Sequence, residues 1–140
     1  MTTPIRLEES EAPISAADLD ALERRFGFAF PLSFRTQYLK FNGGYLPEER
    51  MERQRMAFGG FEPIRYSTLP AETLYLDLLE AFPQLEGLFP FAHDQGGSSF
   101  LIALGERADL GRIYIWLMDG EELLPVADSF DEFVDLLWGE

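Results

Sequence analysis

The chain has 140 residues, 46% of them apolar and thirteen of them Phe, a composition typical of one folded domain with a packed core. Its 25 acidic and 11 basic residues give a formal net charge of −14, which disfavours contact with nucleic acid or anionic lipid. Such a charge favours cationic partners, although acidity also simply keeps a protein soluble, and both explanations stay open. The absence of cysteine excludes disulfides and thiolate catalysis. With no secretory signal and no apolar run that could span a bilayer, a soluble cytoplasmic protein is expected.

The first predicted helix lies between Ser15 and Gly27. Ser15, with Asp18 three residues later, resembles a capping box, in which a side chain and the backbone exchange hydrogen bonds at the helix start. Gly27 can take the left-handed conformation that often ends a helix. Before it, residues 1–12 are polar and Glu-rich, and we expect a loose or strand-like lead-in. Apolar residues at helical spacing predict the buried stripe of the helix: Leu19, Leu22 and Phe26.

A second helix is predicted from about Pro31 to Phe41. Proline suits a helix start because its missing N–H is not needed there. The Asn-Gly-Gly run at 42–44 tolerates the positive φ of a helix end. Residues 47–56 mix both charge signs with little apolar periodicity, and we expect an exposed loop or a frayed extension there.

A short strand broken by glycines is expected within residues 58–66, followed by a third helix. Ser67 or Thr68 can cap this helix, and Pro83 ends it. One face of the helix is apolar and is expected to be buried: Leu74, Leu78 and Phe82.

The second half of the chain is rich in predicted strands. Asp119-Gly120 is a strong signal for a hairpin, and the run 113–118 is apolar on both faces, as in a central strand. Ser129, with Glu132 three residues later, is expected to open a last helix. The pattern predicts an α+β domain with helices packed on a mostly antiparallel sheet. The strands are expected at 88–92, 100–104, 112–118 and 122–126.

Several short motifs occur along the chain. None of them is diagnostic of a family by itself, but their order and spacing together are specific. They are the first helix leading into Gly27, Phe30-Pro31, residues 42–44, LFPFAHDQGG at 88–97 with 100–104, GRIYIW at 111–116, and DSFDEFVDLL at 128–137. Through them the chain resembles the SMI1/KNR4 family, also called the SUKH superfamily, across nearly its whole length.

The resemblance implies a twisted, largely antiparallel sheet flanked by helices, in a single domain over residues 1–140. Bacterial relatives are mostly immunity proteins that neutralise a toxin delivered by a neighbouring cell, and fungal relatives are linked to cell-wall regulation through partner binding. Relatives often have an acidic residue directly after the glycine pair. Here Gly96-Gly97 is followed by Ser98-Ser99, and Asp94 is the nearest acidic substitute.

Catalysis is not predicted for this chain. His93, Asp94 and Ser98 could be imagined as a hydrolase triad, but the sequence supplies neither a nucleophile elbow nor an oxyanion hole. One histidine and no cysteine do not provide the usual ligands of a zinc site. The Gly-Gly-Ser-Ser run at 96–99 lacks the lysine and spacing of a phosphate-binding loop. We therefore expect no metal and no cofactor.

The function expected from charge and resemblance is non-catalytic protein binding. The first hypothesis is an immunity protein that neutralises a cationic toxin such as a nuclease, and the second is an intracellular regulatory or scaffold protein with an endogenous partner. For the aromatic candidates a place in the core is the favoured alternative. The candidate partner-binding residues are the acidic Asp94, Asp109, Asp119, Glu121 and Glu122, with Tyr45 and Trp116 as aromatic anchors.

Overall fold

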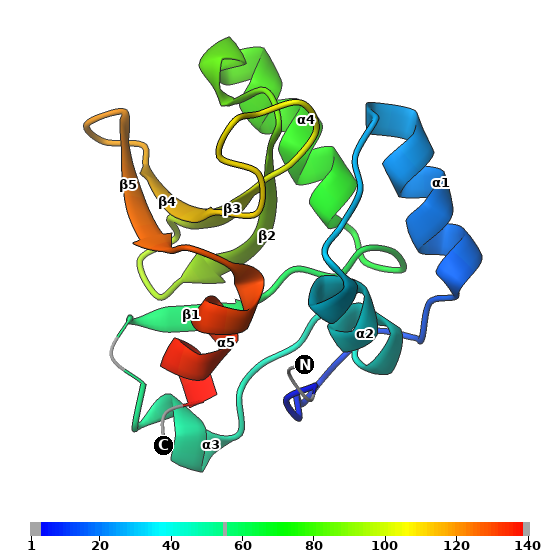
Figure 1. Cartoon of the computed structure of the whole chain (residues 1–140). Helices are drawn as coiled ribbons and strands as arrows, with labels where there is room; N and C mark the ends of the chain where they lie inside the picture. The colour runs from blue at the N-terminus through cyan, green and yellow to red at the C-terminus, as the bar shows by residue number, and fades with distance from the viewer. Residues whose placement is uncertain (1–3, 55, 139–140) are drawn as a thin grey trace.

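The computed structural model describes residues 4–54 and 56–138 (Figure 1). The fold is α+β, as the sequence predicts, with one five-stranded antiparallel sheet whose strands lie side by side in chain order. The strands are β1 (Phe58–Phe61), β2 (Leu88–Asp94), β3 (Ser99–Ala103), β4 (Ile113–Leu117) and β5 (Glu122–Ala127). The helices are α1 (Ala16–Phe26), α2 (Leu32–Lys40), α3 (Glu48–Met51), α4 (Ala71–Ala81), the 3-10 helix η1 (Pro83–Leu85) and α5 (Phe130–Trp138).

Both faces of the sheet contribute buried residues, and each face packs against different elements. Ile113 of β4 belongs to the larger core, which α1, α2 and α5 cover. Trp116 of the same strand belongs to a smaller core on the other face, where Phe82 and Leu85 pack against it from the end of α4 and from η1. This confirms the run 113–118 as an inner strand that is apolar on both faces.

Phenylalanine dominates the larger core. The ring of Phe34 stacks on Phe30 and Tyr38 at centroid distances of 4.5 and 4.7 Å and meets the edge of Phe130 at 5.2 Å. Such aromatic pairs add about 0.5–1.5 kcal/mol each beyond the burial of their surface. The rings thus join α2, the segment before it and α5 into one packed unit.

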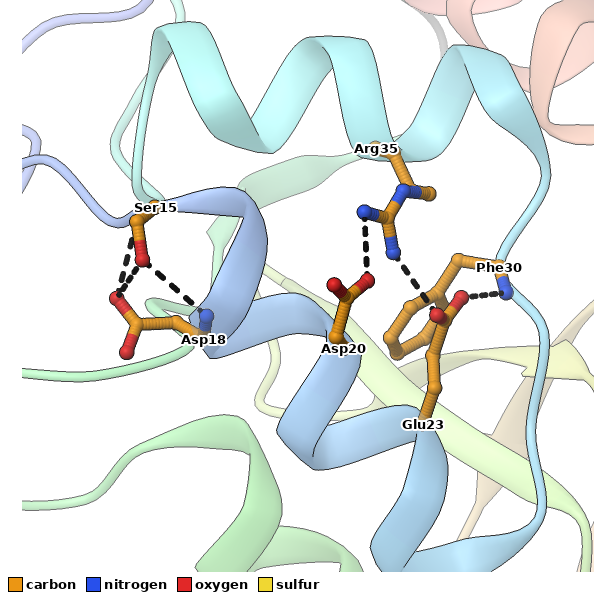
Figure 2. Close-up of polar contacts among 6 residues, drawn as sticks. All are labelled: Ser15, Asp18, Asp20, Glu23, Phe30 and Arg35. Carbon is orange, nitrogen blue, oxygen red and sulfur yellow. Dashed lines mark hydrogen bonds and ion pairs between the residues drawn. The ribbon is translucent and has the colours of Figure 1, made fainter.

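Helix α1 begins and ends at the predicted residues. Ser15 is the N-cap, and its hydroxyl and the Asp18 carboxylate form the expected capping box (Figure 2). Gly27 ends the helix with a φ of 72°, the left-handed conformation that a residue with a Cβ adopts only with strain.

A polar clamp then fixes the turn between α1 and α2 (Figure 2). The Glu23 carboxylate accepts a hydrogen bond from the backbone N–H of Phe30 at 2.7 Å and pairs with Arg35 at 2.8 Å. A second nitrogen of Arg35 reaches Asp20 at 3.0 Å. Because Glu23 and Arg35 are only 18% and 21% exposed, this pair is shielded more than a surface ion pair.

The segment 47–56, expected to be an exposed loop, contains the short helix α3, so the loop prediction is wrong for its first part. Pro47 precedes α3 and presets the backbone for a helix start. The guanidinium of Arg50 lies 4.3 Å from the Trp138 ring centroid and donates to the Trp138 carbonyl at 2.6 Å. This contact spans 88 residues of sequence, so local periodicity could not indicate it. Residue 55 lies outside the described residues.

Helix α4 begins later than predicted, at Ala71 after Pro70, and neither Ser67 nor Thr68 caps it. The Pro63 carbonyl takes the place of a side-chain cap, because it accepts a hydrogen bond from the N–H of Ala71 at 2.9 Å. The buried residues of the first turns are Ala71 and Tyr75, while Leu78 and Phe82 pack on the smaller core and Leu74 is half-buried.

The lead-in is strand-like, as predicted, and Asn42 holds it in place. Isolated β-bridges join Glu8 to Tyr45 and Glu11 to Asn42. The Asn42 side chain, 1% exposed, donates to the carbonyls of Ala12 and Arg65 at 2.9 and 3.0 Å. Its oxygen also accepts the N–H of residue 64 at 2.8 Å. Asn42 therefore ties three distant segments together, beyond its predicted place at a helix end.

The last helix begins with the predicted capping residues Ser129 and Glu132. The Ser129 hydroxyl accepts the N–H of Glu132 at 3.1 Å. The Glu132 carboxylate accepts a hydrogen bond at 3.2 Å from the backbone N–H of Asp128, one residue before the Ser129 N–H that a capping box would use. Within residues 4–54 and 56–138, no helix has the length and apolar character needed to cross a membrane.

Candidate partner-binding surface

Two hairpin tips form one end of the sheet, and together they hold four of the predicted acidic residues. Because β3 pairs with β4 through Ser99 and Trp116, the β2–β3 and β4–β5 turns lie at the same end, on the left in Figure 1. The tips enclose a hollow of about 290 Å³ lined by residues 96–98, 117–120 and 122. We call this region the hairpin end; its predicted residues are Asp94, Asp119, Glu121 and Glu122.

The Asp94 carboxylate is hydrogen-bonded to the backbone of its own turn. Its carboxylate accepts the N–H of Gly96 at 3.0 Å and the N–H of Ser98 at 2.7 Å, an arrangement that closes the β2–β3 connection. The residue therefore shapes the rim of the hollow, whichever molecule the hairpin end contacts.

The other three acidic residues are available for contacts. Asp119, Glu121 and Glu122 are exposed, and within the described chain none of their carboxylates forms a hydrogen bond or an ion pair. Glu121 has a φ of 50°, so the left-handed residue of this turn is Glu121 and not the neighbouring Gly120. The Asp-Gly signal correctly predicts the hairpin between β4 and β5.

Charge is divided unequally between the two parts of the chain. Residues 1–65 contain nine basic and ten acidic residues, whereas residues 66–140 contain two basic and fifteen acidic ones, so their formal charges are −1 and −13. From residue 113 to the end of the chain there is no Lys or Arg. Helix α5 has an exposed acidic side that is not among the predicted partner-binding residues: Asp131, Glu132 and Asp135.

Asp109 lies at the opposite end of the sheet, in the β3–β4 connection. Its carboxylate accepts two hydrogen bonds from Arg107, at 2.8 and 3.0 Å, and a short one from the Tyr114 hydroxyl. These hydrogen bonds, that from Arg107 foremost, lower the pKa of Asp109 to about 2. Asp109 is thus already paired within the chain.

The two aromatic candidates lie in different environments. Tyr45 is 46% exposed beside β1, where a side chain on Gly60 would come within 2.8 Å of its ring. Trp116 is 2% exposed beneath Phe82, and its indole nitrogen has no hydrogen-bond partner among the described residues. Trp116 therefore lies under the hairpin end rather than on its surface, as the core alternative expects.

His93 does not form the imagined triad. Its Nδ1 lies 3.0 Å from the Glu62 carboxylate, which raises the pKa of the imidazole by a hydrogen bond against the opposing effect of burial. Asp94 instead bonds to the backbone of its turn. Across residues 4–54 and 56–138, no cluster of three His or acidic side chains is arranged to hold a metal ion.

The fold and this surface define an α+β domain with one antiparallel sheet and exposed, unpaired carboxylates at one end. A model of the SMI1/KNR4 family (SUKH-1) matches residues 13–136, and the chain belongs to this family. The family is generally non-catalytic, is known for immunity proteins and implies binding to a protein partner. A search of curated proteins finds no match to the chain.

Proposed function

We propose that this protein is a non-catalytic immunity protein, acting as one domain over residues 1–140, that neutralises a cognate toxin with a basic surface. The observation that carries the proposal is the charge of −13 on residues 66–140, with unpaired carboxylates at the hairpin end. Membership of a family known for immunity proteins supports it. A nuclease is the clearest example of such a toxin, because its substrate groove must be basic to hold phosphate.

In this proposal the hairpin end competes with the toxin's own substrate for a basic groove. Asp119, Glu121 and Glu122 would face the cations, Asp94 would hold the rim, and Trp116 would support it from below. Tyr45 and Asp109 lie apart from this end and would contribute only if the toxin also reaches β1 or the β3–β4 connection. The binding occurs in the cytoplasm, where an intracellular toxin acts, without contact with nucleic acid or membrane, which the acidic surface repels.

The second candidate is an intracellular regulatory or scaffold protein with an endogenous partner. The same surface would serve it, because charge complementarity does not depend on whether the partner is toxic. Gene neighbourhood separates the two: a toxin gene directly upstream favours immunity, and its absence favours regulation.

The test is purification of the tagged protein with the products of its adjacent genes, followed by association kinetics at low and high salt. We expect a partner that is toxic when expressed alone, with an association rate that falls as salt rises. Reversing two charges, in Glu121→Lys with Glu122→Lys, should slow association at low salt by about tenfold or more.

The matched control is Glu48→Lys with Glu52→Lys, which reverses two exposed charges in the nearly neutral part of the chain. This control should associate at close to the wild-type rate. Equal slowing by both double variants would remove the hairpin end from the interface, and a stable complex with a housekeeping protein instead of a toxic one would favour regulation.

A further inference from the structure

A second cavity lies at the end of the sheet opposite the hairpin end. It has a volume of about 460 Å³ and is lined by residues from the end of α1, the start of β2 and the β3–β4 connection. A neighbouring hollow of about 390 Å³ along α4 shares Phe26, Tyr75 and Glu86 with it. We call the two hollows together the α1–α4 pocket.

Aromatic rings line one side of this pocket. Phe26 meets the edge of Tyr75 at a centroid distance of 5.1 Å, and Phe28 lies 5.5 Å from Phe26 and 5.6 Å from Tyr75. The face of an aromatic ring attracts a cation, and Phe26 already has the guanidinium of Arg25 at 5.3 Å from its centroid. That guanidinium is neutralised by an ion pair with Glu72 of α4.

Two carboxylates without a partner line the pocket beside the rings. Glu86 and Glu106 are exposed, and neither side chain has a hydrogen bond or ion pair within the described chain. The nearby cation, Arg107, is held by the two hydrogen bonds that it donates to the Asp109 carboxylate. The pocket is therefore left with an uncompensated negative charge.

Backbone groups add to this preference. The carbonyl end of α1, an eleven-residue helix, lies at the pocket through Phe26 and Gly27, and the C-terminal end of a helix favours positive charge. The walls are also fixed in place, because the Tyr75 hydroxyl accepts the N–H of Gly87 at 2.8 Å. Gly87 has a φ of 84°, a conformation that favours glycine, and an added Cβ would come within 2.9 Å of the Arg107 side chain.

We propose that the α1–α4 pocket binds a cationic side chain, an arginine or lysine, of a partner protein. Phe26, the partly exposed ring of the three, would contact the side chain while Glu86 and Glu106 pair with its charge. This inference goes beyond the proposed toxin complex, because it assigns a ligand class to a site far from the hairpin end, whichever protein supplies the side chain.

The test uses the isolated protein and a small probe, so its outcome does not depend on finding a toxin. The amide resonances of Gly27, Gly87 and Gly105 are followed by NMR during titration with N-acetyl-arginine amide. The neutral analogue N-acetyl-citrulline amide, of nearly the same shape, is the matched probe. We expect saturable shifts with the arginine probe, weakened by added salt, and none with the citrulline probe.

Three variants separate charge and ring effects from changes in fold. Glu86→Gln with Glu106→Gln should weaken binding of the arginine probe by about fivefold, in the range of partly exposed ion pairs. Phe26→Leu should weaken it by about threefold through loss of the ring. Glu80→Gln, an exposed carboxylate of α4 outside the pocket, should bind like wild type. No saturable shift, equal binding of citrulline, or unchanged affinity in the double Gln variant would each overturn the proposal.

Discussion

At the scale of single residues, the buried side chain of Asn42 holds the lead-in and the segment before α4 together. Its place before two glycines correctly predicts the end of a helix. Its burial and its bonds to Ala12 and Arg65 depend on segments 30 and 23 residues away. No periodic pattern encodes such contacts, because they arise only when the lead-in and the segment before α4 meet over the loop after α2.

Among the candidate site residues, the sequence predicts the features that depend on nearby residues and not those that depend on distant segments. The sequence predicts the β4–β5 hairpin, and therefore the exposure of Asp119, Glu121 and Glu122. It does not predict that β2 and β4 end on the same side of the sheet, which brings Asp94 to the same rim. Nor does it predict that Asp109 is paired with Arg107, because a bidentate geometry depends on the path of the loop.

The pair of His93 and Glu62 predicts that the stability of the fold depends on pH. Because Glu62 raises the pKa of His93 above its usual value of about 6.5, the charged pair stabilises the fold below that pH. This stabilisation is lost as the pH rises through the folded-state pKa. Titration of His93 by NMR should give a lower pKa in Glu62→Gln than in wild type, while the distant Glu80→Gln should leave it unchanged.

The stabilisation that this pair provides should decrease as the pH rises. The urea midpoint of Glu62→Gln should fall below that of wild type near about pH 6, and the difference should shrink near about pH 9. A difference that grows with pH would contradict the assigned pair.

At the scale of elements, local signals predicted helices well where the capping groups are close in sequence. The capping box of α1 and the left-handed glycine after it both lie within a few residues of the helix. Helix α4 starts later than expected because its cap, the Pro63 carbonyl, comes from eight residues before Ala71. Helix α3 was missed because its contact with Trp138 comes from the other end of the chain.

The clamp between α1 and α2 should contribute measurably to stability. Glu23→Ala removes the acceptor for the Phe30 N–H and leaves Arg35 without its closer partner. We expect a loss of about 1–3 kcal/mol in the free energy of unfolding, since a shielded donor would be left unsatisfied. Urea denaturation measures it.

Arg24→Ala is the matched control for the clamp, because Arg24 is an exposed residue of the same helix. Its free energy of unfolding should stay within about 0.5 kcal/mol of wild type. If both variants lose the same amount, helix α1 itself and not the clamp is responsible.

At the scale of the whole molecule, a charge of −13 on residues 66–140 should destabilise the fold by self-repulsion. Because salt screens charges over about 10 Å at 0.1 M, the urea midpoint should rise as NaCl is added from low ionic strength. In low salt, Asp77→Lys on α4 should raise the midpoint by roughly 0.3 M urea. Glu52→Lys, in the nearly neutral part, should change it much less; the reverse order of the two variants would contradict this explanation.

The same division of charge has a consequence for motion in solution. Helices α1, α2 and α3 lie along one side of the molecule, and strands β2–β5 lie along the other (Figure 1). A body with its negative charge displaced to one side has a dipole moment, so the field of an approaching cation exerts a torque on it. The molecule would therefore rotate its sheet toward a basic partner before the two surfaces touch, and fewer collisions would be lost to wrong orientations.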